Sequence, residues 1–413
     1  MPAAPANLRG QPEGIVTGGA SEPAAATRTS KVVTIGAAHA AHDTFSAFLP
    51  PMLPVLIERL SLAKAEAGLL TAFLQVPSLL QPWIGHLGDR FDLRIAVILA
   101  PAVTAACMSL LGVAPGFAAM ALLLVTAGSS SAVLHAVGPV LVGRLSGRRL
   151  GSGLGFWMVG GELGRTLGPI VLVSALAVLG LDGLPWLMAG GFVASLLLLF
   201  TLRGLPRPSP STDASVGFGR ALVTMRPLLV PLAGVVVPRS FTMVAVTVFL
   251  PVLLREQGSS LWFAGASLSI LEAAGVAGAL LGGSASDLFG RTRVLAISLL
   301  ATPPLMLALV HASGWGRWPL LLAIGFLGLM ATPVVMAAVQ EAYPENRALA
   351  NGVYMALSFG VRSVVVVLVG LLADAIGMRA AFLTCAGLSL IAVPFVFRLP
   401  PGKVENEASS IRS

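Results

Sequence analysis

Charged residues are scarce in this chain. Asp, Glu, Lys and Arg make up only 11% of its 413 residues, whereas 56% are hydrophobic and the mean hydropathy is +0.89. A soluble domain carries about 25% charged residues, so too few are present here to cover a surface that faces water. The scarcity excludes an ordinary soluble protein and predicts a multi-pass membrane protein whose constant partner is the lipid bilayer.

Cysteines are few, and a nucleotide-binding motif is missing. Cys107 and Cys385 are the two cysteines, and both lie in apolar segments, so they form no disulfide framework. No Gly-x-x-x-x-Gly-Lys-Ser/Thr loop is present, so ATP is not expected to drive the protein directly. We expect no enzyme activity and no cofactor, with a proton gradient as the energy source. The net charge of +8 is explained below by membrane topology, so no nucleic acid partner is expected.

Long apolar segments follow one another along the chain. About 20 mostly apolar residues are needed for a helix to cross a membrane. Twelve such segments lie near 32–57, 65–87, 95–113, 117–143, 152–179, 184–202, 227–254, 262–286, 293–311, 318–342, 349–373 and 380–398. They predict an all-α membrane protein with six spans in each of two halves, 31–202 and 227–398. We expect a Pro/Ser-rich cytoplasmic linker at 203–226 and disordered cytoplasmic tails at 1–30 and 399–413.

Lysine and arginine are distributed unevenly between the loops. With both termini in the cytoplasm, 18 of the 26 basic residues fall in cytoplasmic segments, three lie inside spans and five lie in loops on the opposite side of the membrane. The five are Arg59, Lys64, Arg255, Arg317 and Arg379. Loops rich in Lys and Arg remain in the cytoplasm. This distribution predicts that both termini are cytoplasmic. We expect a multi-pass protein of the plasma membrane, the inner membrane in a bacterium, and a monomer.

The two halves repeat one another. Asp89 and Asp287 follow the second and eighth spans and are 198 residues apart, and Arg165 and Arg362 are 197 apart in the fifth and eleventh spans. Two repeats related by an axis along the membrane normal are typical of carriers that bind substrate near the bilayer midplane, between the halves.

Three arginines lie inside apolar spans: Arg165, Arg239 and Arg362. A guanidinium at the bilayer centre costs about 3 to more than 10 kcal/mol and does not lose its proton, so each must face an aqueous cavity or a partner. The planar fork of donors matches carboxylates and phosphates, which predicts binding of a small anion. Alternatively, Arg165 pairs with Glu162 one turn away, and the other arginines pair with the remaining intramembrane acids.

A histidine and acid cluster is expected in the first span. His39 is three residues from His42 and four from Asp43, so all three share one helix face. They are interpreted as a proton site with Asp43 as carrier, as a transition-metal site that also uses His135, or as a structural polar cluster. Three cavity arginines would repel a metal cation, so we assign no metal ligands.

Glu162 and Glu272 are further candidates for proton coupling. A substrate anion that takes an arginine from a carboxylate leaves that carboxylate free to bind a proton. Other side chains expected to contact substrate are His39, His135, Gln75, Phe45 and Tyr354.

Tryptophans and glycines are assigned structural roles. Trp157, Trp262, Trp315 and Trp318 are interpreted as anchors at the membrane interface. Gly160, Gly164 and Gly168 recur every four residues in the fifth span, which predicts close packing against another helix.

Two loops resemble the signature loop of the major facilitator superfamily. They are Gly85-x-x-x-Asp89-Arg90-x-x-x-Arg94 and its weaker copy, Gly283-x-x-x-Asp287 followed by Gly290-Arg291. The resemblance implies a gating role for Asp89, Arg90, Arg94, Asp287 and Arg291.

Other segments are similar to the fosmidomycin-resistance branch of that superfamily. They include His39-Ala-Ala-His42-Asp43, Leu79-Leu80-Gln81-Pro82, Gly128-Ser129-Ser130 and Leu371-Leu372-Ala373-Asp374. This resemblance implies a proton-driven exporter of a small polar compound. Glu162, Arg165 and Arg362 depart from the branch pattern, as does Ala136-Val137 after His135, so the substrate is expected to differ.

The expected function is secondary active transport. We expect proton-coupled antiport that exports a small anionic or zwitterionic compound by alternating access. The alternatives are a proton–organic anion symporter that imports its substrate, a transition-metal carrier using His39, His42 and Asp43, and a sensor that does not transport.

Overall fold

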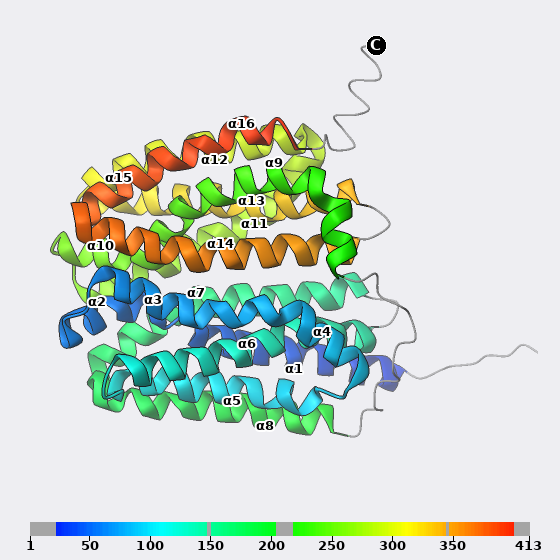
Figure 1. Cartoon of the computed structure of the whole chain (residues 1–413). Coiled ribbons are helices and arrows are strands. Elements are labelled where there is room, and N and C mark those ends of the chain that lie inside the picture. The colour runs from blue at the N-terminus through cyan, green and yellow to red at the C-terminus, as the bar shows by residue number, and fades with distance from the viewer. Residues whose placement is uncertain (1–21, 147–149, 204–217, 344–346, 400–413) are drawn as a thin grey trace, which may run out of the picture.

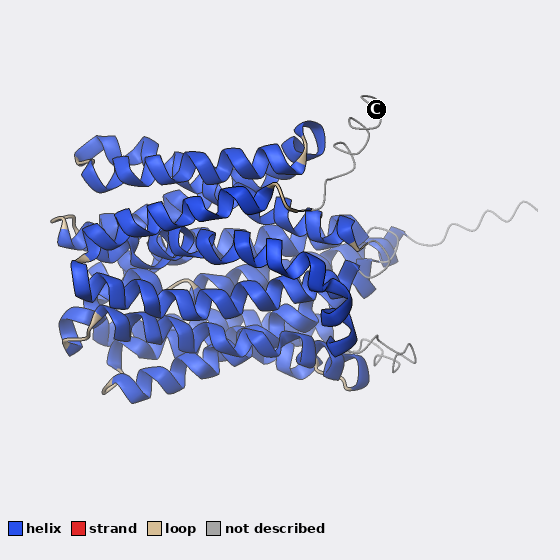
Figure 2. Ribbon diagram, turned by 45° about the horizontal axis from the view of Figure 1, so that its top comes forward, coloured by secondary structure: helices blue, strands red, loops and turns tan. Residues whose placement is uncertain are grey.

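Helices form all of the regular structure in the residues that the computed structural model describes, 22–146, 150–203, 218–343 and 347–399 (Figure 2). The N-terminal half contains α1 (Glu22–Ser46), α2 (Leu49–Leu60), α3 (Lys64–Gln75), η1 (Val76–Leu80), α4 (Gln81–Arg90), α5 (Arg94–Leu110), η2 (Leu111–Val113), α6 (Phe117–Ser146), α7 (Leu150–Gly183), η4 (Leu184–Leu187) and α8 (Met188–Leu202). The C-terminal half contains α9 (Phe218–Val244), the π-helix η5 (Ala245–Phe249), α10 (Leu250–Glu256), α11 (Leu261–Phe289), α12 (Arg291–His311), η6 (Gly314–Gly316), α13 (Arg317–Ala342), α14 (Arg347–Ile376), α15 (Met378–Ser389), η8 (Leu390–Ala392) and α16 (Val393–Val396).

Two helices begin earlier than the sequence suggested. The first, α1, begins at Glu22, inside the expected tail 1–30, and α9 begins at Phe218, inside the expected linker 203–226. The expected tail segments 1–21 and 400–413 and the linker segment 204–217 lie outside the described residues.

Nine helical segments of the described ranges are long and apolar enough to cross a membrane. One of them, Phe156–Leu202, covers two expected spans. The bend between the two lies at Gly180 (φ 65°, ψ −173°), a conformation that favours glycine. The expected spans 32–57 and 65–87 are not among the nine. The first is divided between α1 and α2, and the second is built from α3, η1 and α4. The all-α membrane fold is confirmed, and twelve spans are consistent with it.

The two halves lie against each other along several helix pairs. Figure 1 shows the N-terminal half below and the C-terminal half above, with α7 and α3 close to the boundary. Across it, α7 packs against α11, α3 against α14, and α2 against α10. The largest apolar core crosses this boundary. It includes Phe48, which immediately precedes α2, Leu253 from α10 and Val366 from α14. The α7–α11 and α3–α14 contacts therefore form the two main seams between the halves.

Polar contacts join the halves at the end of the bundle where α2, α3 and α10 meet, on the left in Figure 1. The carboxylate of Asp374 in α14 accepts hydrogen bonds from the backbone N–H groups of Lys64 (2.9 Å) and Ala65 (2.8 Å) at the start of α3. The Lys64 ammonium also pairs with Glu256 of α10 at 2.9 Å. These contacts hold the two halves together at this end of the bundle.

The glycines of α7 allow α1 to approach closely. A Cβ on Gly160, Gly164 or Gly168 would overlap the backbone carbonyl oxygen of Gly36, Ala40 or Thr44, respectively, in α1. The close packing predicted from their spacing is confirmed. It brings the polar side chains of α1 and α7 together.

Candidate functional site

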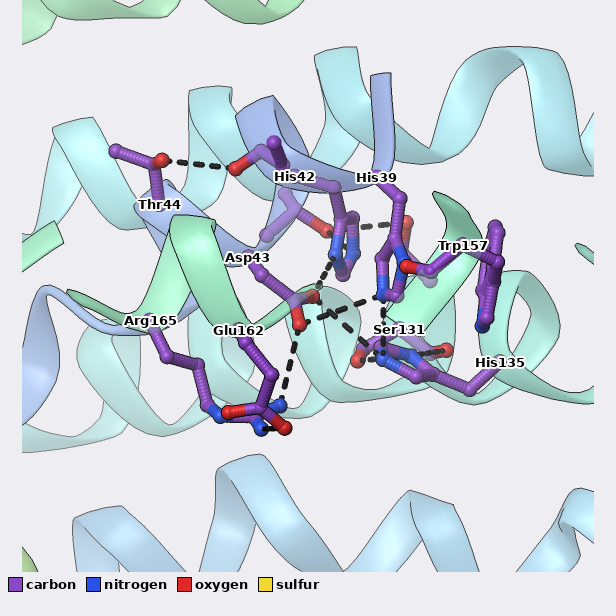
Figure 3. A network of polar contacts seen from close by, with 12 residues as sticks. His39, His42, Asp43, Thr44, Ser131, His135, Trp157, Glu162 and Arg165 are labelled. Atoms are coloured by element: carbon purple, nitrogen blue, oxygen red, sulfur yellow. Dashed lines mark hydrogen bonds and ion pairs between the residues drawn. The ribbon is translucent and has the colours of Figure 1, made fainter. Parts of the chain in front are cut away.

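Asp43 lies at the centre of a polar cluster inside the N-terminal half (Figure 3). Its side chain is 4% exposed. Oδ1 of Asp43 accepts a hydrogen bond from Nδ1 of His42 at 2.8 Å and lies 3.6 Å from Nε2 of His135. Oδ2 lies 3.4 Å from Nε2 of His39 and 3.6 Å from Nη1 of Arg165. Three imidazoles and a guanidinium therefore surround one buried carboxylate, which compensates the cost of burying its charge.

Three helices build this cluster. His39, His42 and Asp43 come from one face of α1, as their spacing predicted, His135 comes from α6, and Arg165 comes from α7. The absence of a side chain at Gly161 makes room for it, because a Cβ there would lie 2.6 Å from Cε1 of His39 and 3.1 Å from Oδ2 of Asp43.

Backbone carbonyls fix the proton on one nitrogen of two imidazoles. Nδ1 of His39 lies 2.9 Å from the carbonyl oxygen of Trp157, and Nδ1 of His135 lies 2.9 Å from that of Ser131. A carbonyl oxygen can only accept, so both Nδ1 atoms carry a proton. The two Nε2 atoms face each other at 3.2 Å.

His42 connects the cluster to α5 and α6. Its Nε2 lies 3.0 Å from the Thr104 hydroxyl, which is 3.2 Å from the hydroxyl of Ser130, which in turn donates to the carbonyl oxygen of Ala100. No role was predicted for Thr104, and Ser130 was placed only in a family motif. More than one hydroxyl residue occurs in each of these two spans, so nothing in the sequence distinguished Thr104 and Ser130 from the others.

Arg165 reaches from the cluster toward the other half. It forms an ion pair with Glu162 as well as with Asp43, and its side chain is 41% exposed although it lies in the middle of a long apolar helix. Glu272 on α11 interacts electrostatically with both Arg165 and Glu162. Arg165 therefore lies where the two halves face each other.

Arg362 and Glu272 belong to the C-terminal side of this site. Arg362 donates a hydrogen bond to the Thr247 hydroxyl at 2.9 Å and interacts electrostatically with Glu272 and Arg165. Oε2 of Glu272 is buried and has no hydrogen-bond partner among the described residues. Two guanidiniums from opposite halves and an unsatisfied carboxylate oxygen thus share one region.

Arg239 is directed into the C-terminal half. It donates to the carbonyl oxygen of Gly328 (2.7 Å) and to the hydroxyl of Thr332 (3.0 Å), in a small pocket also lined by Ser298 and Thr302. It interacts electrostatically with Arg362, but it is not brought to the Asp43 cluster. Within the described residues neither Arg239 nor Arg362 forms an ion pair.

The other residues that were expected to contact substrate lie in different environments. Phe45 is buried and packs against Phe48, with ring centroids 5.1 Å apart. Tyr354 is buried in the core of the C-terminal half. Gln75 ends α3, and its Oε1 is buried without a hydrogen-bond partner among the described residues. Phe45 packs in the core, Tyr354 interacts electrostatically with Arg239, and Gln75 retains an unused acceptor.

Trp157 is not an interface anchor. It is 4% exposed and stacks on His39, with ring centroids 3.7 Å apart and an interplanar angle of 17°. Its position near the start of an apolar segment suggested the membrane interface, but the close approach of α7 to α1 buries it. Trp262 and Trp315, by contrast, are exposed.

The signature loops are only partly within the described structure. Arg291 pairs with Asp287 at 2.5 Å and with Glu341 of α13 at 3.0 Å, all in the C-terminal half. Arg94 lies 3.6 Å from Asp92 in its own half. The side chains of Asp89 and Arg90 lie outside the described residues.

One set of side chains has the composition of a metal site. Ligand atoms of His39, Asp43 and His135 lie within 4.8 Å of one another. A divalent cation among them would face the Arg165 guanidinium, which is 3.6 Å from the same carboxylate, and like charges at that range repel strongly in a buried site. We therefore treat none of these residues as a metal ligand.

Two helical halves that enclose intramembrane charges define a class of proteins, the secondary transporters that bind substrate between repeats. A family model described as "Major Facilitator Superfamily" matches residues 35–328 and 273–412. The chain belongs to this superfamily. It is a multi-pass membrane transporter and not an enzyme.

Two similar sequences cover nearly the whole chain. The fosmidomycin resistance protein of Escherichia coli (strain K12) is 24% identical over 397 residues, 94% of this chain and 97% of that protein. An uncharacterized transporter of the same superfamily, YfnC of Bacillus subtilis (strain 168), is 25% identical over 382 residues, 89% of this chain and 92% of that protein. The resemblance to the fosmidomycin-resistance branch is confirmed.

Solved structures share the fold. A bacterial homolog of the human lysosomal transporter Spinster, inward-facing and unoccupied, has a TM-score of 0.77 and 17% identity, covering 91% of this chain and 97% of that one. The nucleoside transporter NupG has a TM-score of 0.70 and 15% identity, covering 90% of this chain and 98% of that one.

Proposed function

We propose that this transporter exports a small zwitterionic or anionic compound in exchange for protons. The observation that carries the proposal is the position of Arg165, which pairs with Asp43 and Glu162 in one half and interacts with Glu272 and, through it, Arg362 in the other. A small ligand between the halves would meet guanidinium donors from both. The similarity to a protein named for fosmidomycin resistance favours export. We place the protein in a bacterial inner membrane, as a monomer with cytoplasmic termini.

The direction of coupling depends on whether substrate and proton compete. An anion that takes Arg165 from its carboxylates makes those carboxylates bind protons more tightly, and by reciprocity the proton promotes binding of the anion. A purely anionic substrate would therefore travel with the proton, which is symport. The route to coupling suggested by the sequence alone thus favours the importer rather than the exporter.

Exchange requires a substrate that displaces the proton. A zwitterion does so when its anionic end binds Arg165 or Arg362 and its cationic end occupies a carboxylate that otherwise binds the proton. Glu272 offers such an acceptor, because its buried Oε2 has no hydrogen-bond partner among the described residues. Of the two substrate classes, the zwitterion is the one that this geometry joins to export.

A ligand screen tests the proposal. The Tm of the purified protein is measured with amino acids, aminophosphonates, phosphonates, carboxylates, sugar phosphates, cationic drugs and divalent metals, because a ligand of the folded state raises its stability. We expect stabilisation by zwitterions or anions, lost in Arg362→Ala and retained in Arg255→Ala, whose exposed guanidinium donates to the carbonyl oxygen of nearby Ser259. Stabilisation by cations or metals alone would contradict it.

Proton counting with the ligand found in that screen then decides between the two directions. Release of protons into a weakly buffered solution when ligand binds indicates competition and therefore exchange. Uptake of protons indicates that both are bound together, which favours the importing symporter. Transport into inverted and right-side-out vesicles under a pH gradient checks the same conclusion.

A further inference from the structure

The two imidazoles that face each other in the cluster lack a conventional hydrogen bond in their neutral forms. Both His39 and His135 use their Nδ1 protons on backbone carbonyls, at 2.9 Å each. When both rings are neutral, their Nε2 atoms carry only lone pairs. Two lone pairs would then point at each other across 3.2 Å, beside the Asp43 carboxylate.

One added proton removes this conflict. An Nε2–H on either ring donates to the lone pair of the other, and the resulting imidazolium lies 3.4 to 3.6 Å from the oxygens of Asp43. Burial makes the unpaired arrangement costly and the paired one favourable. The ring of Trp157, stacked on His39 at 3.7 Å, offers its π-face to the same cation.

Other charged groups surround the pair on each packed helix. On α1 these are His42 and Asp43, and on α7 they are Glu162 and Arg165, with Glu272 of α11 acting through Arg165. From α5 the contact is the uncharged hydroxyl of Thr104, and the sequence of α8 has no titratable side chain. Among the described residues, Asp43 is the carboxylate in contact with both Nε2 atoms.

We infer that His39 and His135 together bind one proton, and that this pair, with Asp43 as its fixed counter-charge, is a proton site of the transporter, distinct from the Glu272 carboxylate that a cationic substrate group would occupy. The sequence alone favoured Asp43 as carrier. In the structure Asp43 already accepts from Nδ1 of His42 at 2.8 Å and faces Arg165 at 3.6 Å, contacts that suit a carboxylate and not a carboxylic acid.

The pair is connected to the substrate site through one carboxylate. Gain or loss of the proton changes the charge next to Asp43, and Arg165 contacts the same carboxylate from the side of the cavity. This role in coupling rests on the proposed function, whereas the proton site itself does not.

Trp157 provides an internal reporter of the pair. An imidazolium stacked on an indole quenches its fluorescence, so the emission of the full-length protein should fall as pH is lowered and the pair takes up its proton. The measurement is made in detergent with a metal chelator and without substrate. The chain has six tryptophans. Trp157→Phe should remove the pH-dependent component, which shows that this component comes from Trp157 and not from the other five.

Histidine and aspartate variants then locate the proton. We expect the pH-dependent component to be lost in His39→Gln, displaced along the pH axis in His135→Gln, and still present in Asp43→Asn. His311→Gln, on the far helix α12, is the matched control and should leave it unchanged. His135→Gln keeps the test usable if His39→Gln fails to fold, because the His135 side chain is partly exposed.

Two results would overturn the inference. A component that survives in the His39→Gln, His135→Gln double variant but vanishes in Asp43→Asn would make Asp43 the carrier. A wild-type emission with no pH dependence attributable to Trp157 would leave no proton on the pair. Since no substrate is present, a failed ligand screen leaves this result untouched, and the reverse also holds.

Discussion

Arg165 is the residue on which the substrate proposal depends most. Lysine keeps its charge but not the planar fork that matches a carboxylate or phosphonate. Loss of a charge-assisted hydrogen bond costs about 1.5–3 kcal/mol, or roughly 10- to 150-fold in Kd. We expect Arg165→Lys to weaken binding of the ligand found in the screen by that amount, and Arg165→Ala to weaken it further, measured by calorimetry. Equal Kd values for wild type and both variants would show that Arg165 has only a structural role.

Asp43 has a different predicted effect, because it contacts the proton site and not the cavity. Asp43→Asn removes the counter-charge for the imidazole pair while leaving Glu162 to orient Arg165. We expect ligand binding to remain within a few-fold of wild type, whereas uphill transport driven by a pH gradient is lost in reconstituted vesicles. Downhill exchange of labelled for unlabelled substrate should persist and serves as the control. If the variant still concentrates substrate under a pH gradient, Asp43 is not needed for coupling.

The part of the site that lies on one helix could be predicted from sequence. Spacing alone put His39, His42 and Asp43 on one face of α1, and the same rule gave the Glu162–Arg165 pair. The partners from other helices could not be placed in this way. Trp157 was assigned to the membrane interface, and His135 was joined to His39 only in the alternative of a metal site, because both contacts depend on how α6 and α7 pack against α1.

At the scale of elements, hydropathy predicted the spans better than it predicted their ends and breaks. Local features decide those breaks: the bend at Gly180, the turn between α1 and α2, and the π-helix at Ala245–Phe249. A π-turn inside an α-helix has no clear hydropathy signal. It matters here because Thr247, which accepts from Arg362, lies within it.

The packing of α1 on α7 is an element-scale requirement for the site. At Gly164 a Cβ would lie 2.8 Å from Cβ of Asp43 and 2.9 Å from the backbone nitrogen of Thr44. We expect Gly164→Val to separate the helices, to lower the Tm at a cost of about 1–3 kcal/mol, and to reduce the pH-dependent emission of Trp157. Gly387→Ala is the control, because nothing lies within 4 Å of a Cβ there, and its Tm should not fall. An unchanged Tm in Gly164→Val would mean that α1 and α7 need no close contact.

At the scale of the whole molecule, the structure is closed at one end by contacts between the halves. Asp374 caps the start of α3 through two backbone N–H groups, and Lys64 pairs with Glu256. The distribution of basic residues predicts that this end faces away from the cytoplasm. Under the proposed export, substrate would reach Arg165 from the cytoplasm, and these contacts would break before it leaves.

Removal of the Asp374 cap should therefore open this end. A carboxylate at a helix N-terminus contributes about 0.5–2 kcal/mol, enough to shift a balanced equilibrium between two states several-fold. We expect Asp374→Ala to lengthen the distances between spin labels placed at Glu58→Cys in α2 and Arg379→Cys in α15, after replacement of Cys107 and Cys385. The exposed Lys64–Glu256 pair contributes less, so Lys64→Glu should lengthen them slightly, and Lys64→Glu with Glu256→Lys should restore them. Since Asp374 binds backbone groups, the exchanged pair should not rescue Asp374→Ala. Distances that stay the same in Asp374→Ala would show that apolar packing between α3 and α14, where Gly68 meets Val366, closes the cavity without the cap.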